Sequence, residues 1–220
     1  MRGNGVYALL AMCLVSCGRE SAYRSDSTGA AAVCLADSIG SLQLVPSVPK
    51  CAPDRIACEV KCRIGDAASC LGLAYAAEGA SSPEEVRGLY RHACIAGAAN
   101  ACTNYAASLW AGPMAEEQLA CVRRTLEKAC AVREQFACGM AARVVLESGG
   151  NAEVTEWRRY LQSKCDEVGG FSCRVLAKHL EAGTFGKVDG QAIPTLLKRA
   201  CDGGDIYACG NHATAVETFN

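Results

Sequence analysis

Apolar side chains recur along most of this chain with the spacing of amphipathic helices. In four successive segments, two apolar residues precede a cysteine by eight and by four positions. This i, i+4 pattern places both side chains on one face, so each segment is expected to form a helix, here called helix A, that buries this face. The eight residues are Val86 and Tyr90, Val122 and Leu126, Trp157 and Leu161, and Ile193 and Leu197.

A second helix, helix B, is expected after each helix A, because cysteines recur in a fixed pattern around a short turn. Ten cysteines form five pairs, and in each pair the second cysteine follows the first by eight positions. Successive pairs start 32, 36, 35 and 36 residues apart. Such a period is typical of helical repeats, so the predicted fold is an all-α solenoid of about five antiparallel helix pairs. The pairs are Cys62 with Cys70, Cys94 with Cys102, Cys130 with Cys138, Cys165 with Cys173, and Cys201 with Cys209.

The segments between helices carry capping and turn residues. Ser82-Pro83-Glu84-Glu85 matches a capping box, with a serine N-cap and proline at the first helical position. Between helix A and helix B, the run Cys201-Asp202-Gly203-Gly204-Asp205 predicts a tight turn. The first two repeats also have glycine at the place of Gly204, whereas the third repeat has Arg133. A turn of another shape is therefore expected in the third repeat.

The N-terminal residues have the pattern of a bacterial export signal. Arg2 precedes an apolar stretch that is too short to span a membrane. The run Leu14-Val15-Ser16-Cys17 resembles the lipobox of bacterial lipoproteins, so residues 1–16 are predicted to be a signal peptide and Cys17 to be acylated. An ordinary cleaved signal with Cys17 at its boundary is the alternative. Gly18, where an aspartate would favour the inner membrane, implies the outer membrane and the periplasm.

Two further segments complete the predicted organisation. Residues 17–50 are expected to be a lipidated flexible tether that ends in an N-terminal cap, because residues 19–32 are rich in Ser, Gly, Ala and charge. Residues 51–220 are expected to be the cysteine-rich domain of five repeats.

The composition requires a source of stability other than a large core. The chain has 38 alanines and 16 cysteines but only 13 aromatic residues, so its core buries little area per residue. Thiols outside the cytosol pair, and each cysteine pair brackets the turn between two antiparallel helices. The ten cysteines are therefore expected to form five disulfide staples of about 2.5 kcal/mol each. A spacing of eight does not suit two ligands of one zinc ion, and no metal or other cofactor is predicted.

Four cysteines fall outside the five pairs: Cys34, Cys51, Cys58 and Cys121. They leave three pairings open. Cys58 takes a core position on the first helix A, so a bond to Cys51 or Cys34 would fasten a cap onto the first repeat. For Cys121, two repeats away, three alternatives stay open: the N-terminal segment folds back to it, it is a free or intermolecular thiol, or it is a simple buried cysteine.

The repeat unit resembles a known family. Ala-Cys before a glycine-rich turn and Ala-Cys after it, as in residues 199–209, is similar to the cysteine-rich Sel-one-like repeats (Hcp-type) of secreted bacterial proteins, which are tetratricopeptide-like solenoids. The resemblance covers about residues 52–220. It implies a scaffold for protein–protein or envelope-ligand interactions. The alternative that it implies is weak binding or hydrolysis of β-lactams, or binding of peptidoglycan fragments.

Catalytic motifs do not support the enzymatic alternative. Ser47-Val48-Pro49-Lys50 matches the Ser-x-x-Lys element of serine β-lactamases by letter, but it lies in a proline-flanked linker, and the Ser-Asp-Asn and Lys-Thr-Gly elements are absent from the sequence. His92, His179 and His212 are scattered over three repeats without the spacing of metal ligands. A non-enzymatic role is therefore favoured.

Charge points to a partner other than nucleic acid. The net charge is −1, without the excess of positive charge that nucleic-acid binding requires. Arg87, Arg123 and Arg158 each stand seven residues before the first cysteine of a pair, so they are expected to align along helix A as an arginine stripe. The stripe is a candidate binding surface for an acidic protein segment or an anionic envelope ligand, and the alternative is a solvated face.

Overall fold

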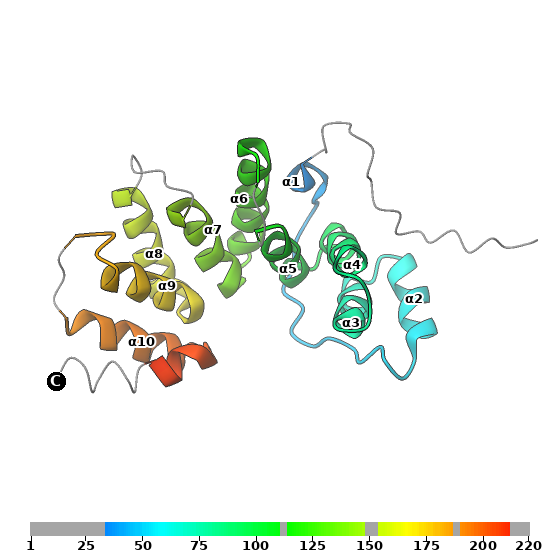
Figure 1. The fold of residues 1–220 in the computed structure, drawn as a ribbon. Coiled ribbons are helices and arrows are strands. Elements are labelled where there is room, and N and C mark those ends of the chain that lie inside the picture. Colours follow the sequence, from blue (N-terminus) through cyan, green and yellow to red (C-terminus); the bar gives the residue numbers. More distant parts are fainter. Residues whose placement is uncertain (1–33, 111–113, 148–153, 187–189, 212–220) are drawn as a thin grey trace, which may run out of the picture.

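The protein folds into a row of antiparallel helix pairs, with α2 at one end and α10 near the other (Figure 1). This computed structural model describes residues 34–110, 114–147, 154–186 and 190–211. The helices are α1 (Leu35–Ser38), α2 (Arg55–Arg63), α3 (Ala67–Ala77), α4 (Pro83–Ile95), α5 (Ala99–Trp110), α6 (Glu116–Ala131), α7 (Gln135–Glu147), α8 (Val154–Val168), α9 (Gly170–Glu181) and α10 (Ala192–Asp202). Residues 206–211 form a further helix that pairs with α10.

The predicted all-α solenoid is confirmed. Each helix from α2 to α10 packs against the next one along the chain, and the five pairs begin with α2, α4, α6, α8 and α10. The apolar stripe of helix A lies in the core, where Leu126 and Leu161 are fully buried. Helix B contributes small residues: at Gly139 a Cβ atom would stand only 2.4 Å from the ring of Phe171. Small side chains therefore let neighbouring repeats approach closely.

Disulfide bonds join helix A to helix B in every repeat. In all five bonds the two Cα atoms lie 4.6 to 4.7 Å apart. The bonds join the predicted partners: Cys62 to Cys70, Cys94 to Cys102, Cys130 to Cys138, Cys165 to Cys173, and Cys201 to Cys209.

The position of these bonds in the helix interface changes only at the last repeat. Both cysteines are buried in each of the first four repeats, and Cys138 and Cys173 are completely buried. In the fifth repeat Cys201 is partly exposed and Cys209 is exposed, because no further repeat packs over them within the described residues. The first four staples therefore lie inside the helix interface that they hold together.

The turns between helix A and helix B correct one prediction. Arg133 has a φ of 64°, in the same left-handed region as Gly65, Gly97 and Gly204, so the third repeat keeps the common turn. Its backbone N–H donates to the carbonyl of Cys130 at 2.8 Å, as Gly204 does to Cys201 at 2.9 Å. The left-handed conformation costs an L-residue about 1–2 kcal/mol. A hydrogen bond from the Arg133 guanidinium to the carbonyl of Glu167, 2.9 Å long, offsets part of this cost.

The turn that departs is in the fourth repeat. There α8 continues to Val168, and the left-handed residues are Gly169 and Gly170, one and two positions later than in the other repeats.

The capping box at the start of α4 is confirmed: Ser82 Oγ accepts from Glu85 N–H at 3.3 Å, and the Glu85 carboxylate accepts from Ser82 N–H at 3.1 Å.

Candidate functional site

Residues 34–51 form a strap that crosses the first three repeats and is fastened at both ends by disulfides. Cys34 bonds to Cys121 of α6, and Cys51 bonds to Cys58 of α2. Of the alternatives left open by the sequence, the N-terminal segment therefore folds back to Cys121, and Cys51 caps the first repeat. The predicted signal peptide and Cys17 lie outside the described residues.

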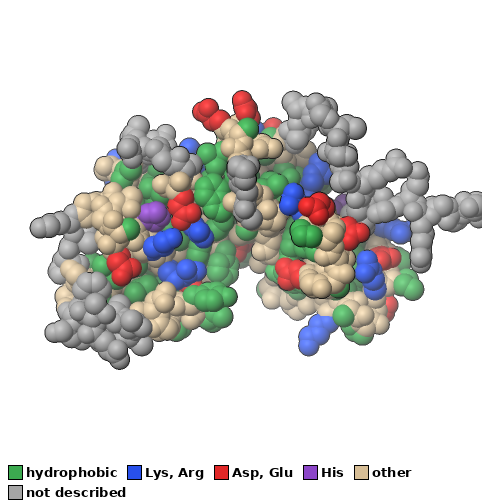
Figure 2. All heavy atoms as spheres, in the orientation of Figure 1, with side chains coloured by type: hydrophobic (Ala, Val, Ile, Leu, Met, Phe, Trp, Pro, Cys, Tyr) green, Lys and Arg blue, Asp and Glu red, His purple; other side chains and the backbone are tan. Residues whose placement is uncertain are grey.

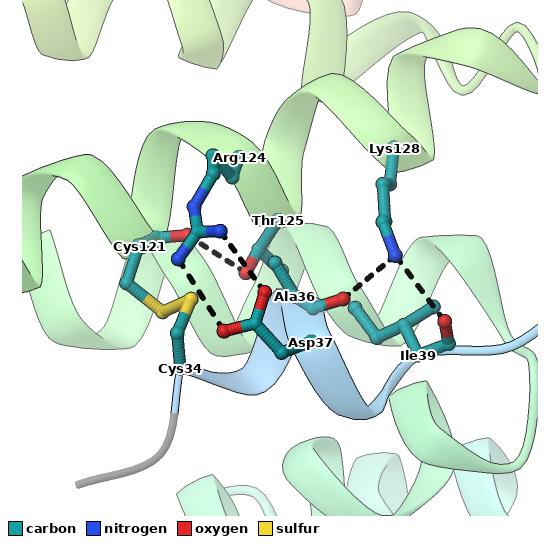
Figure 3. Close-up of polar contacts among 8 residues, drawn as sticks. All are labelled: Cys34, Ala36, Asp37, Ile39, Cys121, Arg124, Thr125 and Lys128. Atoms are coloured by element: carbon teal, nitrogen blue, oxygen red, sulfur yellow. Dashed lines mark hydrogen bonds and ion pairs between the residues drawn. A yellow bond between two sulfur atoms is a disulfide. The ribbon is translucent and has the colours of Figure 1, made fainter.

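Polar contacts hold the first part of the strap against α6 (Figure 3). The guanidinium of Arg124 donates to the carboxylate of Asp37 at 2.9 Å, and Lys128 Nζ donates to the carbonyls of Ala36 at 2.7 Å and Ile39 at 3.3 Å. Lys128 thus binds one carbonyl of the one-turn helix α1 and that of Ile39, the residue that follows this helix. Two basic residues of helix A are in this way used to seat the strap.

The middle of the strap binds α5 in an extended conformation. Gln43 N–H donates to the Gly97 carbonyl at 2.9 Å, and the Gln43 carbonyl accepts from Ala99 N–H at 3.0 Å. Val45 N–H donates to the side-chain oxygen of Asn100 at 3.0 Å. The face formed by helix B and its preceding turn therefore binds an extended backbone through both main-chain and side-chain groups.

A pocket of about 690 Å³ lies directly beside this stretch of strap. Its walls come from the strap, α3, α5, the turn before α7, α7 and the end of α8. Two aromatic side chains in its lining, Tyr75 and Phe136, are 39% and 40% exposed. The lining residues are Leu44, Val45, Pro46, Tyr75, Asn100, Thr103, Asn104, Arg133, Glu134, Gln135, Phe136 and Val168. The pocket thus combines aromatic and aliphatic surface with amide, hydroxyl and charged groups, as ligand sites do.

Glu134 is the buried ionisable group of this pocket. It is only 4% exposed and caps α7, where its carboxylate accepts from Ala137 N–H at 2.6 Å and from Thr103 Oγ1 at 2.7 Å. Burial raises the pKa of Glu134 above its usual value, although these hydrogen bonds act in the opposite direction. The carboxylate is therefore well ordered but poorly solvated.

The charge on Glu134 is expected to cost stability near neutral pH. Because its pKa is higher in the folded state than in the unfolded chain, the folded protein becomes relatively more stable as the pH falls from 7 toward the ordinary value of 4.5. Glu134→Gln removes this titration. The difference between the urea midpoints of the parent and of Glu134→Gln, parent minus variant, should therefore increase as the pH is lowered from 7 to 4.5. A difference that does not change with pH would contradict the assignment.

Tyrosine hydroxyls extend the polar lining toward α4. Tyr75 packs edge-on against Tyr90 with ring centroids 6.0 Å apart, and Asn104 Nδ2 donates to the Tyr75 hydroxyl at 3.5 Å. The Tyr90 hydroxyl donates to the Glu78 carboxylate. Burial raises the pKa of Tyr75 above its usual range, so its hydroxyl stays protonated at neutral pH. Tyr75 can thus serve as a hydrogen-bonding group of the pocket.

The arginine stripe lies on three successive helix A elements, α4, α6 and α8. Arg123 pairs with Glu127 at 2.9 Å, and its guanidinium carbon lies 5.0 Å from the centre of the Trp157 ring. Arg158 donates to the carbonyl of Phe185 at 3.3 Å, and Arg87 is half-buried. Part of the donor capacity of the stripe is therefore used within the chain. Its binding to an acidic ligand stays a prediction.

The other residues singled out from the sequence do not gather into one site. Ser47 and Lys50 are exposed on the strap, outside any helix. His92 lies near Cys62 and Cys70, but their sulfur atoms are joined to each other and are not available as metal ligands. His179, in α9, lies beside Thr184 and Phe185, and burial lowers its pKa. His212 lies outside the described residues.

Sequence reasoning did not find the pocket, although one signal pointed to it. Four residues after the first cysteine of a pair, the chain has an acidic residue in three repeats: Asp66, Glu134 and Asp205. All three cap helix B by accepting backbone N–H groups. This repeated acidic position therefore marks where one repeat packs against the next. The strap, which closes one side of the pocket, has no counterpart in the repeat pattern.

No described helix is long and apolar enough to span a lipid bilayer. Comparison with family models, with curated proteins and with solved structures finds no match for this chain.

Proposed function

We propose that this protein is an exported, lipid-anchored scaffold of the cysteine-rich Sel-one-like type, and that its pocket binds an extended segment of a protein partner. The observation that supports a binding role most directly is the strap itself. Residues 43–45 lie on helix B as an extended chain held by backbone bonds and by Asn100. Leu44, Val45 and Pro46 of the strap line one side of the pocket, whose other sides offer the same kind of groups.

Asn104 and the two aromatic residues suit the continuation of such a chain. Asn104 lies one helical turn after Asn100, so both amides are on the same face of α5. Tyr75 and Phe136 are rigid and half-exposed, and their burial by a ligand would release water from apolar surface. Acidic and basic side chains are interspersed on the face of the molecule that Figure 2 shows.

The disulfides support one part of the proposed cellular location. Seven disulfides indicate an oxidising, exported environment. The lipobox-like run at Leu14–Cys17 supports acylation of Cys17 and outer-membrane anchoring as part of the proposal. Mass spectrometry of the N-terminal peptide from envelope fractions tests this point, because the acyl chains add a defined mass to Cys17.

Selection of peptides from a random displayed library against the oxidised protein tests the binding function. Peptides that bind the pocket should lose at least tenfold in affinity for Tyr75→Ala/Phe136→Ala, because both apolar walls are truncated. Ile56→Ala/Ile64→Ala is the matched control, since both residues are highly exposed, at 76% and 81%, and lie outside the pocket. Equal binding to parent, pocket variant and control would contradict the proposal.

A further inference from the structure

Two junctions between repeats have equivalent residues but different partners. Thr103 and Arg174 each follow the second cysteine of a pair, and Glu134 and Asp205 each follow the first cysteine of the next pair by four residues. At one junction Arg174 Nε donates to Asp205 Oδ2 at 2.6 Å. At the other, Thr103 Oγ1 donates to Glu134 Oε2 at 2.7 Å. The same place in the fold therefore holds a guanidinium in one case and a hydroxyl in the other.

At the Asp205 junction the buried carboxylate is neutralised within the chain. The Asp205 side chain is fully buried, and it pairs with the guanidinium of Arg174, which also contacts two aromatic rings. Its central carbon is 4.6 Å from the ring centre of Phe171 and 5.6 Å from that of Tyr207. Carboxylate and aromatic faces together thus form a complete site for a planar cation.

At the Glu134 junction the corresponding groups face the pocket. Phe136 follows Glu134 by two residues, as Tyr207 follows Asp205, and both Glu134 and Phe136 line the pocket. Within the described ranges, no basic side chain forms an ion pair with Glu134. The nearby guanidinium of Arg133 is turned to the carbonyl of Glu167 instead. Buried carboxylates are normally paired, so this one is suited to a cation from outside the chain.

We propose that the pocket binds the guanidinium of an arginine side chain in the bound partner segment, with Glu134 as counter-ion and Phe136 as stacking surface. The inference rests on the proposed peptide-binding function and specifies its ligand class. The guanidinium takes the place that Arg174 has at the Asp205 junction. A carboxylate accepts about four hydrogen bonds, and Glu134 accepts three, from Thr103, Ala137 and Phe136, so a further donor can be accommodated.

The first test is a titration with a minimal probe, followed by nuclear magnetic resonance of the amides of the pocket. The oxidised full chain is titrated with the tripeptide acetyl-Gly-Arg-Gly-amide and with its citrulline analogue, which has nearly the same shape but no charge. The arginine peptide should bind at least tenfold more tightly than the citrulline peptide. A lysine peptide should bind with intermediate affinity, because an ammonium is a point charge that stacks less well.

Thr103→Arg provides the second test, because it builds the Asp205 arrangement into the pocket. This variant should lose binding of the arginine peptide by at least tenfold and should unfold at a higher temperature than the parent. Ala107→Arg is the matched control, since it adds the same charge at an exposed position of α5 that does not line the pocket, and it should leave binding of the arginine peptide unchanged. Glu134→Gln should bind the arginine and citrulline peptides alike. Circular dichroism and the mass of the oxidised variants verify the fold.

Three outcomes would overturn the inference: equal affinity for arginine and citrulline peptides, unchanged binding by Thr103→Arg, or no binding of any of the three peptides. Library peptides that depend on Tyr75 and Phe136 but not on a basic residue would refute the arginine assignment and leave the peptide-binding function intact. If binding of no library peptide depends on the pocket, both the arginine assignment and the proposed peptide-binding function are wrong.

Discussion

Complete reduction of the disulfides is expected to unfold this protein without any denaturant. In the chain-entropy account, each of the five staples with a separation of eight contributes about 2.5 kcal/mol, and the long Cys34–Cys121 bond contributes about 4 kcal/mol. Together these contributions match or exceed the free energy of unfolding of an ordinary domain, about 5–15 kcal/mol. Among the described residues, the buried core contains three aromatic side chains, Tyr90, Trp157 and Phe171, and is otherwise built mainly from alanine, cysteine and aliphatic residues, so it offers little to replace the disulfides.

Far-ultraviolet circular dichroism before and after treatment with a phosphine reductant measures this effect. The helical signal should collapse and should return on reoxidation with a glutathione redox pair. The control is protein exposed to the oxidised form of the reductant. Retention of most of the helical signal after all cysteines are shown by mass spectrometry to be reduced would contradict the assignment of stability to the disulfides.

Removal of the Cys34–Cys121 bond is expected to have the largest effect of any single disulfide. It spans 87 residues, and even after the shorter internal bonds are allowed for, its loop restricts the unfolded chain enough to stabilise the fold by about 4 kcal/mol. Cys34→Ser/Cys121→Ser should therefore lower the free energy of unfolding by about this amount in urea. The strap should also exchange its amide hydrogens faster, because α1 is a single turn that relies on α6.

Two controls separate the disulfide from its surroundings. Cys51→Ser/Cys58→Ser removes the bond at the other end of the strap, but the loop has a separation of only seven, so the expected loss is about 2 kcal/mol. Arg124→Ala removes the ion pair with Asp37, which is half-exposed on both sides, and should cost less than about 1 kcal/mol. If the ion-pair variant cost more than the disulfide variant, the loop-entropy argument would be wrong.

The repeat architecture could be predicted from the sequence because its determinants are local. Helix faces, cysteine pairs and the Ser82 cap depend on residues within a few turns of one another, and five copies of one pattern reinforce the signal. Arg133 shows the limit of this reasoning. A residue with a Cβ atom at this position predicts a different turn. The fourth repeat instead stabilises the left-handed conformation of Arg133, because the carbonyl of Glu167 accepts a hydrogen bond from its guanidinium.

By itself, the sequence determined that this chain forms helix pairs, where they turn and which cysteines staple them. Only the tertiary structure decided that Cys34 reaches Cys121, that the strap forms one wall of a pocket, and that Glu134 meets Thr103 rather than an arginine. The physical reason is one of range. Contacts within a turn follow from periodicity, whereas contacts between residues 31 or 87 positions apart depend on how the repeats stack and on the path of a strap that no repeat encodes.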